Sequence, residues 1–189
     1  MNRLLVMALM MFVLSCKRTD VREYEAPKEN FPPKSAVRDQ IEQAFAQTPS
    51  IQLKTPTAWK GQPPTPMRKA SFVVEAEDGA KVDISVTSFP NESGGLLANI
   101  NRWRAQLGLE ESELLEPTIE RRMLAGREFV IVDLANEPAP GSKKQRITGA
   151  ILSVQDETWF FKMTGDDALT AAQRPAFLEV LESVQFRSP

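Results

Sequence analysis

From residue 70 onward, six stretches of the chain have the apolar patterning of β-strands, most clearly the alternation of apolar and polar side chains in the first two. The stretches cover residues 70–74, 82–86, 118–124, 128–134, 147–154 and 158–164. Short turns link the stretches in three pairs, with Asp78-Gly79 and residues 125–127 as hairpin signals, so the strands are expected to pair largely antiparallel. Residues 129–132 are apolar on both faces, which is typical of a central strand covered by two layers.

One amphipathic helix is predicted between the second and third of these strands. Its apolar face consists of Leu96, Leu97, Ile100, Trp103 and Leu107. Asn91 or Ser93 is expected to cap its start, and Gly108 is expected to end it. The helix therefore has one face to bury against the sheet.

A second helix is predicted near the C-terminus. This helix is expected to start near Pro175, because proline is tolerated in the first turn of a helix. A turn or short helix that begins at Asp166 or Asp167 is expected to precede it. The buried stripe of the second helix consists of Phe177, Val180, Leu181 and Val184. A weaker stripe over residues 35–47 predicts a short helix that packs on the domain or continues a stalk. The alternative for that segment is a partner-binding or membrane-surface helix.

Composition narrows the function classes. The chain of 189 residues has 23 Lys and Arg against 25 Asp and Glu, and it has no histidine. The near balance of charge argues against nucleic acid as a partner, since phosphate binding needs a concentrated basic face. The lack of histidine excludes His-based acid–base catalysis, Ser-His-Asp and Cys-His machinery, and most zinc sites. We therefore expect no cofactor, no metal and no catalytic residue.

The first 15 residues have the pattern of an export signal. Arg3 precedes the apolar run from Leu4 to Leu14, which has the length of a signal-peptide core and is shorter than the roughly 20 residues of a membrane-spanning helix. The run leads into Ser15 and Cys16, and Cys16 is the single cysteine of the chain. This end of the segment resembles the lipobox of bacterial lipoproteins.

The lipobox resemblance implies cleavage before Cys16 and attachment of a diacylglyceryl group to its thiol. Two or more acyl chains anchor a protein stably where one does not, so the chain is expected to be exported and held on a membrane. In lipoproteins of bacteria with two membranes, Asp after the cysteine goes with retention at the inner membrane. Lys17 stands there instead, which favours the outer membrane, facing the periplasm, if the cell has two.

These patterns divide the chain into three parts. Residues 1–15 form the signal peptide, and residues 16–54 the lipid anchor, a flexible tether and the short helix. Residues 55–189 form a single α+β domain, with a largely antiparallel six-stranded sheet covered by helices. Its lead-in over residues 49–66 is rich in proline, and Trp59 is expected to fold from it onto the edge of the core.

The element order resembles the Mog1/PsbP-like fold, with its α/β/α layers. The resemblance rests on residues 99–103 of the middle helix and on residues 161–165 before the final segment, 177–186. It covers roughly residues 55–189 and is greatest to uncharacterised bacterial lipoproteins. The family includes a Ran-binding nuclear transport factor and an extrinsic subunit of photosystem II, so the resemblance implies a non-enzymatic binding or assembly scaffold. It transfers no catalytic residue.

Three residues of the middle helix are candidate contacts with a protein partner. Asn99, Arg102 and Gln106 lie on its polar side, and Arg102 stands next to Trp103. Arg and Trp are over-represented at interaction hot spots. The structural alternative is that Trp103 belongs to the core while Asn99 and Arg102 tie the helix to neighbouring loops.

Other charged groups favour structural roles. Glu110, Glu111, Glu113 and Glu116 form an acidic cluster without the spacing of a calcium loop, which predicts a solvated loop. Lys143, Lys144 and Arg146 form a small basic loop that could alternatively touch anionic lipid headgroups. Asp166 and Asp167 are expected to cap a helix. Asp83, Asp133 and Lys162 are the charges inside otherwise apolar strands, where an active-site group would be sought first.

Three hypotheses for function follow. The first is a membrane-anchored envelope lipoprotein that acts as a non-enzymatic binding or assembly module. The second is a structural envelope lipoprotein with no discrete ligand. The third is an enzyme that works without histidine, for which the sequence offers no nucleophile motif and no phosphate-binding loop.

Overall fold

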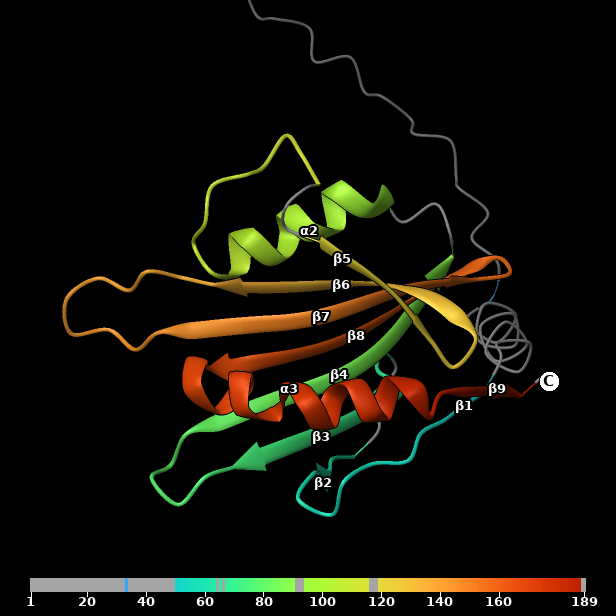
Figure 1. The fold of residues 1–189 in the computed structure, drawn as a ribbon, viewed down its shortest axis with the longest axis horizontal. Coiled ribbons are helices and arrows are strands. Elements are labelled where there is room, and N and C mark those ends of the chain that lie inside the picture. The colour runs from blue at the N-terminus through green and yellow to red at the C-terminus, as the bar shows by residue number, and fades with distance from the viewer. Residues whose placement is uncertain are drawn as a thin grey trace, which may run out of the picture. The chain divides into compact units, whose positions relative to one another are not determined.

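A seven-stranded antiparallel sheet is the centre of the computed structural model, which describes residues 33, 50–63, 65, 67–90, 94–115 and 119–187. In sheet order the strands are β2 (Lys60–Gly61), β3 (Ala70–Glu75), β4 (Lys81–Pro90), β8 (Glu157–Asp166), β7 (Gln145–Val154), β6 (Arg127–Ala135) and β5 (Ile119–Leu124) (Figure 1). The export segment, Cys16, the tether and the helix expected over residues 35–47 lie outside the described residues.

The α+β class and the antiparallel pairing are confirmed, whereas the count of six strands is wrong. The missed strand is β2, which lies in the proline-rich lead-in and pairs with β3 through Lys60 and Gly61. Two residues are too few to show an alternating pattern, and backbone pairing at a sheet edge needs no apolar side chain. A second, two-stranded sheet joins β1 (Ser50–Gln52) to β9 (Gln185–Arg187), so residues N-terminal to position 55 pair with the end of the chain.

The helix α3 (Asp167–Glu182) covers one face of the sheet, over β4, β8 and β7. Phe177 and Leu181 pack there with Phe129 and Phe161 of the sheet. Trp59 joins this core from the lead-in as predicted. Its exposed fraction is 5%, and its Nε1 donates to Gln173 Oε1 at 3.0 Å. The core on this face therefore combines side chains of the central strands with side chains from both ends of the domain.

The predicted start of α3 near Pro175 is wrong, because one helix runs through the proline. Asp166 caps it nine residues earlier, its Oδ1 accepting from the amides of Ala168 and Leu169 at 3.1 and 3.2 Å. Pro175 removes one helical hydrogen bond. Leu169 and Thr170 before it and Phe177 after it all lie against the core, and this packing keeps the helix continuous.

The helix α2 (Gly95–Gln106) covers the opposite face, alongside β6 (Figure 1). Its core cluster includes Ile100, Trp103 and Phe160, and the Trp103 and Phe160 rings meet edge to face at 6.3 Å. A Cβ at Gly149 of β7 would overlap the Trp103 ring, so the glycine makes room for the indole. The two helices therefore lie on opposite faces, and the structure has the α/β/α layers.

The predicted cap of α2 also needs correction. Asn91 and Ser93 lie outside the described residues, and the cap residue is Gly94 at φ +101°, without a side-chain cap hydrogen bond. The predicted end is confirmed, since Gly108 adopts φ +69° and donates its amide to Ala105 at 3.0 Å. In the described part of the chain, neither helix has the length and apolar character that crossing a membrane requires.

Candidate functional site

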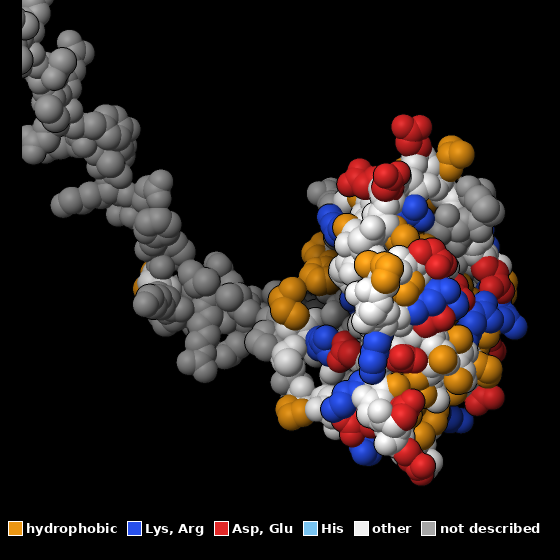
Figure 2. Space-filling model, turned by 90° about the vertical axis from the view of Figure 1, so that its left-hand side faces the viewer, with side chains coloured by type: hydrophobic (Ala, Val, Ile, Leu, Met, Phe, Trp, Pro, Cys, Tyr) orange, Lys and Arg blue, Asp and Glu red, His pale blue; other side chains and the backbone are white. Residues whose placement is uncertain are grey.

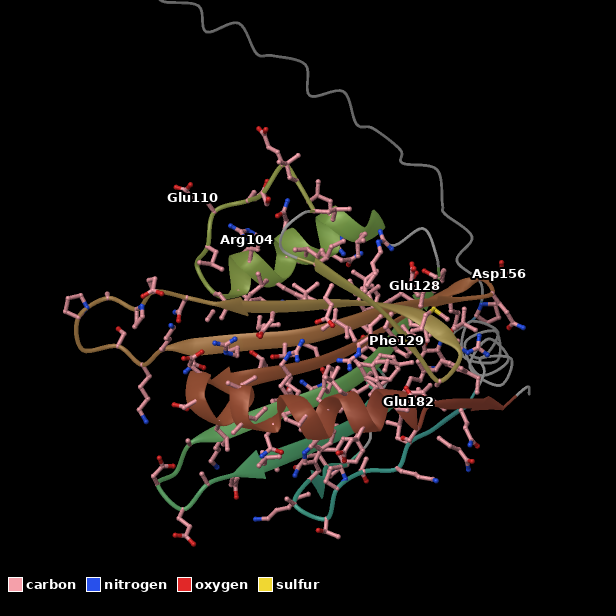
Figure 3. All side chains as sticks on the ribbon, viewed as in Figure 1. Arg104, Glu110, Glu128, Phe129, Asp156 and Glu182 are labelled. Carbon is pink, nitrogen blue, oxygen red and sulfur yellow. The ribbon has the colours of Figure 1, made fainter. Side chains whose placement is uncertain are left out.

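A hollow of about 630 Å³ opens where α2 begins. Its walls are the first turns of α2, the β5–β6 hairpin, and the parts of β7 and β8 near the turn that joins them. Leu96, Val130 and Ile151 supply an apolar lining that is continuous with the core under α2. Figure 3 shows Glu128 of the hairpin and Asp156 of the β7–β8 turn at the same end of the sheet. The hollow therefore joins buried apolar surface to a charged rim.

The hairpin supplies the charged groups of this rim. Arg121 Nη1 donates to Glu128 Oε2 at 2.9 Å, with both side chains about half exposed. Arg127 also lines the hollow, and its guanidinium carbon lies 5.1 Å from the centre of the Phe186 ring. Two arginines against one glutamate give the rim a net charge of +1. Met123, with 64% of its surface exposed, is the cross-strand neighbour of Glu128.

A tight turn places these groups side by side. Ala125 and Gly126 form a two-residue connection in which both residues have positive φ, of 51° and 71°. This backbone matches the twist of paired strands and fixes their register. As a result Arg121 and Glu128 stand diagonally on one face of the hairpin, within ion-pair distance. The sequence predicted the turn, but no sequence pattern identified Arg121 or Arg127 as site residues.

The three candidate residues of α2 do not gather in one place. Asn99 lines the hollow and is 8% exposed. Its Nδ2 donates to the Gly95 carbonyl at 2.7 Å, while its Oδ1 accepts from Arg102 Nη1 at 2.6 Å. Arg102 Nη2 lies 3.0 Å from where a Cβ would stand on Gly94, so its guanidinium lies over the start of the helix. Asn99 and Arg102 thus brace the wall of the hollow.

Gln106 lies at the other end of α2. Its Oε1 accepts from Lys162 Nζ of β8 at 2.9 Å. The seven residues that separate Asn99 from Gln106 correspond to about 10 Å along a helix axis. Gln106 is therefore outside the hollow and belongs to a second polar group on the same face of the sheet.

Two members of the basic loop, Lys144 and Arg146, are paired with neighbouring carboxylates. Arg146 of β7 pairs with Asp133 through Nη1 at 2.9 Å and with Asp167 through Nε at 2.7 Å. Lys144 lies 3.6 Å from a Glu137 carboxylate oxygen. Figure 2 views the left-hand end of Figure 1, where the β6–β7 loop lies, and shows positive and negative side chains interspersed there. Asp133 is therefore part of a structural ion-pair network.

The acidic cluster is a solvated loop in its described part. Glu110, Glu111 and Glu113 are exposed, and Figure 3 shows Glu110 away from the sheet. Glu116 lies outside the described residues. The backbone oxygen of Glu110 accepts from Arg104 Nε at 2.6 Å, which fixes the loop to the end of α2. Over the described ranges, no three acidic or cysteine side chains come together as metal ligands would.

No protein-family model and no curated protein sequence matches the chain. Three solved structures have a similar arrangement of elements. LpqN, involved in cell envelope biogenesis of Mycobacterium tuberculosis, is 13% identical over 76% of this chain and 86% of its own, with a TM-score of 0.46. The cyanobacterial PsbP of Synechocystis is 13% identical over 73% of this chain and 93% of its own, with a TM-score of 0.44.

The third structure comes from Bacteroides thetaiotaomicron. It is 11% identical over 75% of this chain and 47% of its own, with a TM-score of 0.46. At such identities and scores the similarity extends to no ligand, partner or activity. The chemistry of the site therefore has to be argued from this chain's own residues.

Proposed function

We propose that this chain is a lipid-anchored module of the bacterial envelope, which binds a protein partner in the hollow beside α2 and catalyses no reaction. The observation that carries the proposal is the composition of the hollow. An apolar lining of Leu96, Val130 and Ile151 lies beside the exposed Met123 and beneath a rim of net charge +1. A buried apolar centre within a polar rim is the usual anatomy of a protein interface.

The positive net charge of the rim favours a partner that carries a negative charge. Arg121 and Arg127 favour a segment that presents an acidic side chain next to an apolar one. Arginine recognises carboxylates through its fork of donors, and both arginines are held by neighbours that limit their motion. A segment of this kind would place its apolar side chain on Leu96 and Ile151 and its carboxylate at the hairpin.

A binding role agrees with the side chains present. Acid–base catalysis near neutral pH most often uses histidine, which the whole chain lacks. The ionisable groups that line the hollow are Arg121, Arg127 and Glu128, and one arginine already pairs with the glutamate. A structural envelope lipoprotein without a discrete ligand is the alternative that the binding experiment must separate.

Crosslinking from the hollow tests partner binding. A photoreactive residue replaces Ser153, an exposed residue that lines the hollow, or Glu179, an exposed residue of α3, as the matched control. In native membranes we expect Ser153 to give a discrete crosslinked protein that Glu179 does not give. Purified wild-type domain should compete with this product, and Arg127→Glu domain should compete poorly. Equal products from both positions, or equal competition, would favour the structural alternative.

The anchor is tested separately, through Cys16, which lies outside the described residues. Cys16→Ala should abolish labelling with a fatty-acid precursor and leave the protein as unprocessed precursor or in the soluble fraction. Separation of inner and outer membranes then tests the expectation that follows from Lys17. Normal membrane retention of the Cys16→Ala protein would show that the lipobox interpretation is wrong.

A further inference from the structure

A second polar group lies on the α2 face, at the far end of that helix from the hollow. Its centre is Lys162 of β8, whose cross-strand neighbours are Ser85 of β4 and Gly149 of β7. The Trp103 ring packs over Gly149, so the lysine stands at the border between the part of the sheet that α2 covers and the part that it leaves bare. Burial lowers the pKa of Lys162, with Asp83 opposing and Arg68 adding to this effect.

The nearby carboxylate is already engaged by an arginine. Arg68 holds Asp83 with two parallel hydrogen bonds, Nη1 to Oδ1 at 2.8 Å and Nη2 to Oδ2 at 2.9 Å. Nη1 also donates to Ser71 Oγ at 2.9 Å. A bidentate pair of this kind is geometrically well defined, and it occupies both oxygens of Asp83. The arginine and the aspartate therefore act together as a rigid, neutral wall.

Lys162 is left with hydrogen-bonding capacity. An ammonium group has three donors, and among the described residues its acceptor is Gln106 Oε1, a neutral oxygen, at 2.9 Å. Two cations, Arg68 and Lys162, lie within electrostatic reach of one anion, Asp83, so the group has a net charge of +1. The Gln106 Nε2 amide is bonded to the same carbon as Oε1, so it supplies further donors in the neighbourhood of the ammonium.

We propose that Lys162 and Gln106, bordered by the Arg68–Asp83 pair, form a binding site for a carboxylate. The ammonium and the Gln106 amide supply donors on either side of Oε1, and a carboxylate can accept from both, through one oxygen each. An incoming carboxylate replaces solvent around a half-buried cation and brings the local charge to zero. This site is distinct from the hollow and would remain if the proposed partner binding there failed.

The test follows the ammonium itself. In NMR spectra of the purified domain that detect lysine ammonium groups, the Lys162 signal is assigned by its loss in Lys162→Met. Sodium acetate, then an N-acetylated and C-amidated Gly-Glu-Gly peptide, is added at ionic strength held constant with sodium chloride. We expect a saturable shift of the Lys162 signal with acetate, with the peptide or with both. Tighter binding of acetate would indicate a site for a free organic acid, and tighter binding of the peptide would indicate a site for an acidic protein segment.

Two controls decide the outcome. Lys81 pairs with Glu75 at 2.6 Å, so its ammonium signal should shift no more with acetate than with chloride. Gln106→Ala should weaken binding about tenfold, because one donor to a charged ligand is lost. A Lys162 signal that responds to chloride and acetate alike, or a Gln106→Ala domain with unchanged affinity, would overturn the proposal. If Lys162→Met is unstable, Lys162→Arg, which keeps the positive charge, assigns the signal by the same loss, and the titration is then made on the wild type.

Discussion

The two faces of the sheet are built differently. Under α3, side chains from β4, β8, β7 and β6 form one apolar cluster that Trp59 and the turn after α3 extend. On the other face, α2 buries the part formed by β6, β7 and β8, whereas β3 and β4 carry Ser71, Asp83, Ser85 and the Arg68 side chain that lies across them. The hollow and the Lys162 group both belong to this second face. Both faces therefore stabilise the fold, and the half-covered face in addition has polar surface that no helix covers.

The difference follows from strand alternation. Residues 82, 84 and 86 of β4 lie on the α3 face and are fully apolar, while residues 83, 85 and 87 on the α2 face are polar. The helix α2 has 12 residues and is too small to cover all seven strands on its face. The strands that it does not cover therefore face solvent there, and most of their side chains on this face are polar. The two proposed binding sites thus lie where coverage ends, at the start and at the end of α2.

Loss of the Trp103 side chain, from the α2 face, should have the largest effect on the free energy of unfolding. Trp103→Ala removes the ring that packs on Gly149 and Phe160, and we expect a loss of about 3–5 kcal/mol in the free energy of unfolding. Phe177→Ala, its counterpart under α3, should fall in the same range. Urea denaturation measures both, with the exposed Leu114→Ala as control. If Trp103→Ala barely changes the midpoint, α2 does not form a true core layer.

Gly149 offers a smaller and more specific perturbation. Gly149→Ala places a methyl group where the Trp103 ring lies, so we expect a loss of about 1–3 kcal/mol from overpacking. Gly61→Ala is the matched control, because a Cβ there meets no atom within 4 Å. Thermal unfolding of the two variants distinguishes them. Equal melting temperatures would mean that the helix moves away from the sheet without cost.

The Arg68–Asp83 pair should contribute modestly, since it lies on the uncovered part of the sheet. Asp83→Asn keeps the shape of the side chain and removes its charge, and about 0.2–1 kcal/mol should be lost. The loss should shrink as salt concentration rises. Glu128→Gln, in the exposed pair with Arg121, serves as comparison. A loss well above this range would show that the bare half of the face is buried in solution.

The pH dependence contributed by Lys162 should be the smallest effect. Because burial lowers the pKa of folded Lys162, the unfolded chain binds more protons than the folded one at pH values between the two pKa values. The free energy of unfolding of wild type, relative to Lys162→Met, should therefore rise with pH across an alkaline interval that ends at about pH 10.4, the usual lysine pKa. Denaturation at a series of pH values measures this difference. A difference that falls with pH would mean that Lys162 is stabilised as a cation.

Much of the fold was predictable from local pattern. Apolar patterning located the six longer strands of the sheet, and the stripe containing Ile100 and Trp103 identified the face of α2 that is buried. These signals are local, since the period of a strand or helix is set by backbone geometry within a few residues. The same reasoning failed at Pro175, where packing of residues on both sides outweighed a local rule, and at β2, where two residues carry no period.

The sequence by itself determined the alternation of the strands, the apolar stripes of the helices, the lack of histidine and the single cysteine at the end of an export-like segment. Tertiary structure alone decided which distant side chains meet. Gln106 and Lys162 are 56 positions apart, and Trp59 and Gln173 are 114 apart, yet each pair shares a hydrogen bond. The hollow likewise needs α2, the hairpin and β7 together. Such contacts depend on the order of the strands and on which part of each face a helix covers. Neither property produces a periodic pattern in the sequence around the residues that meet.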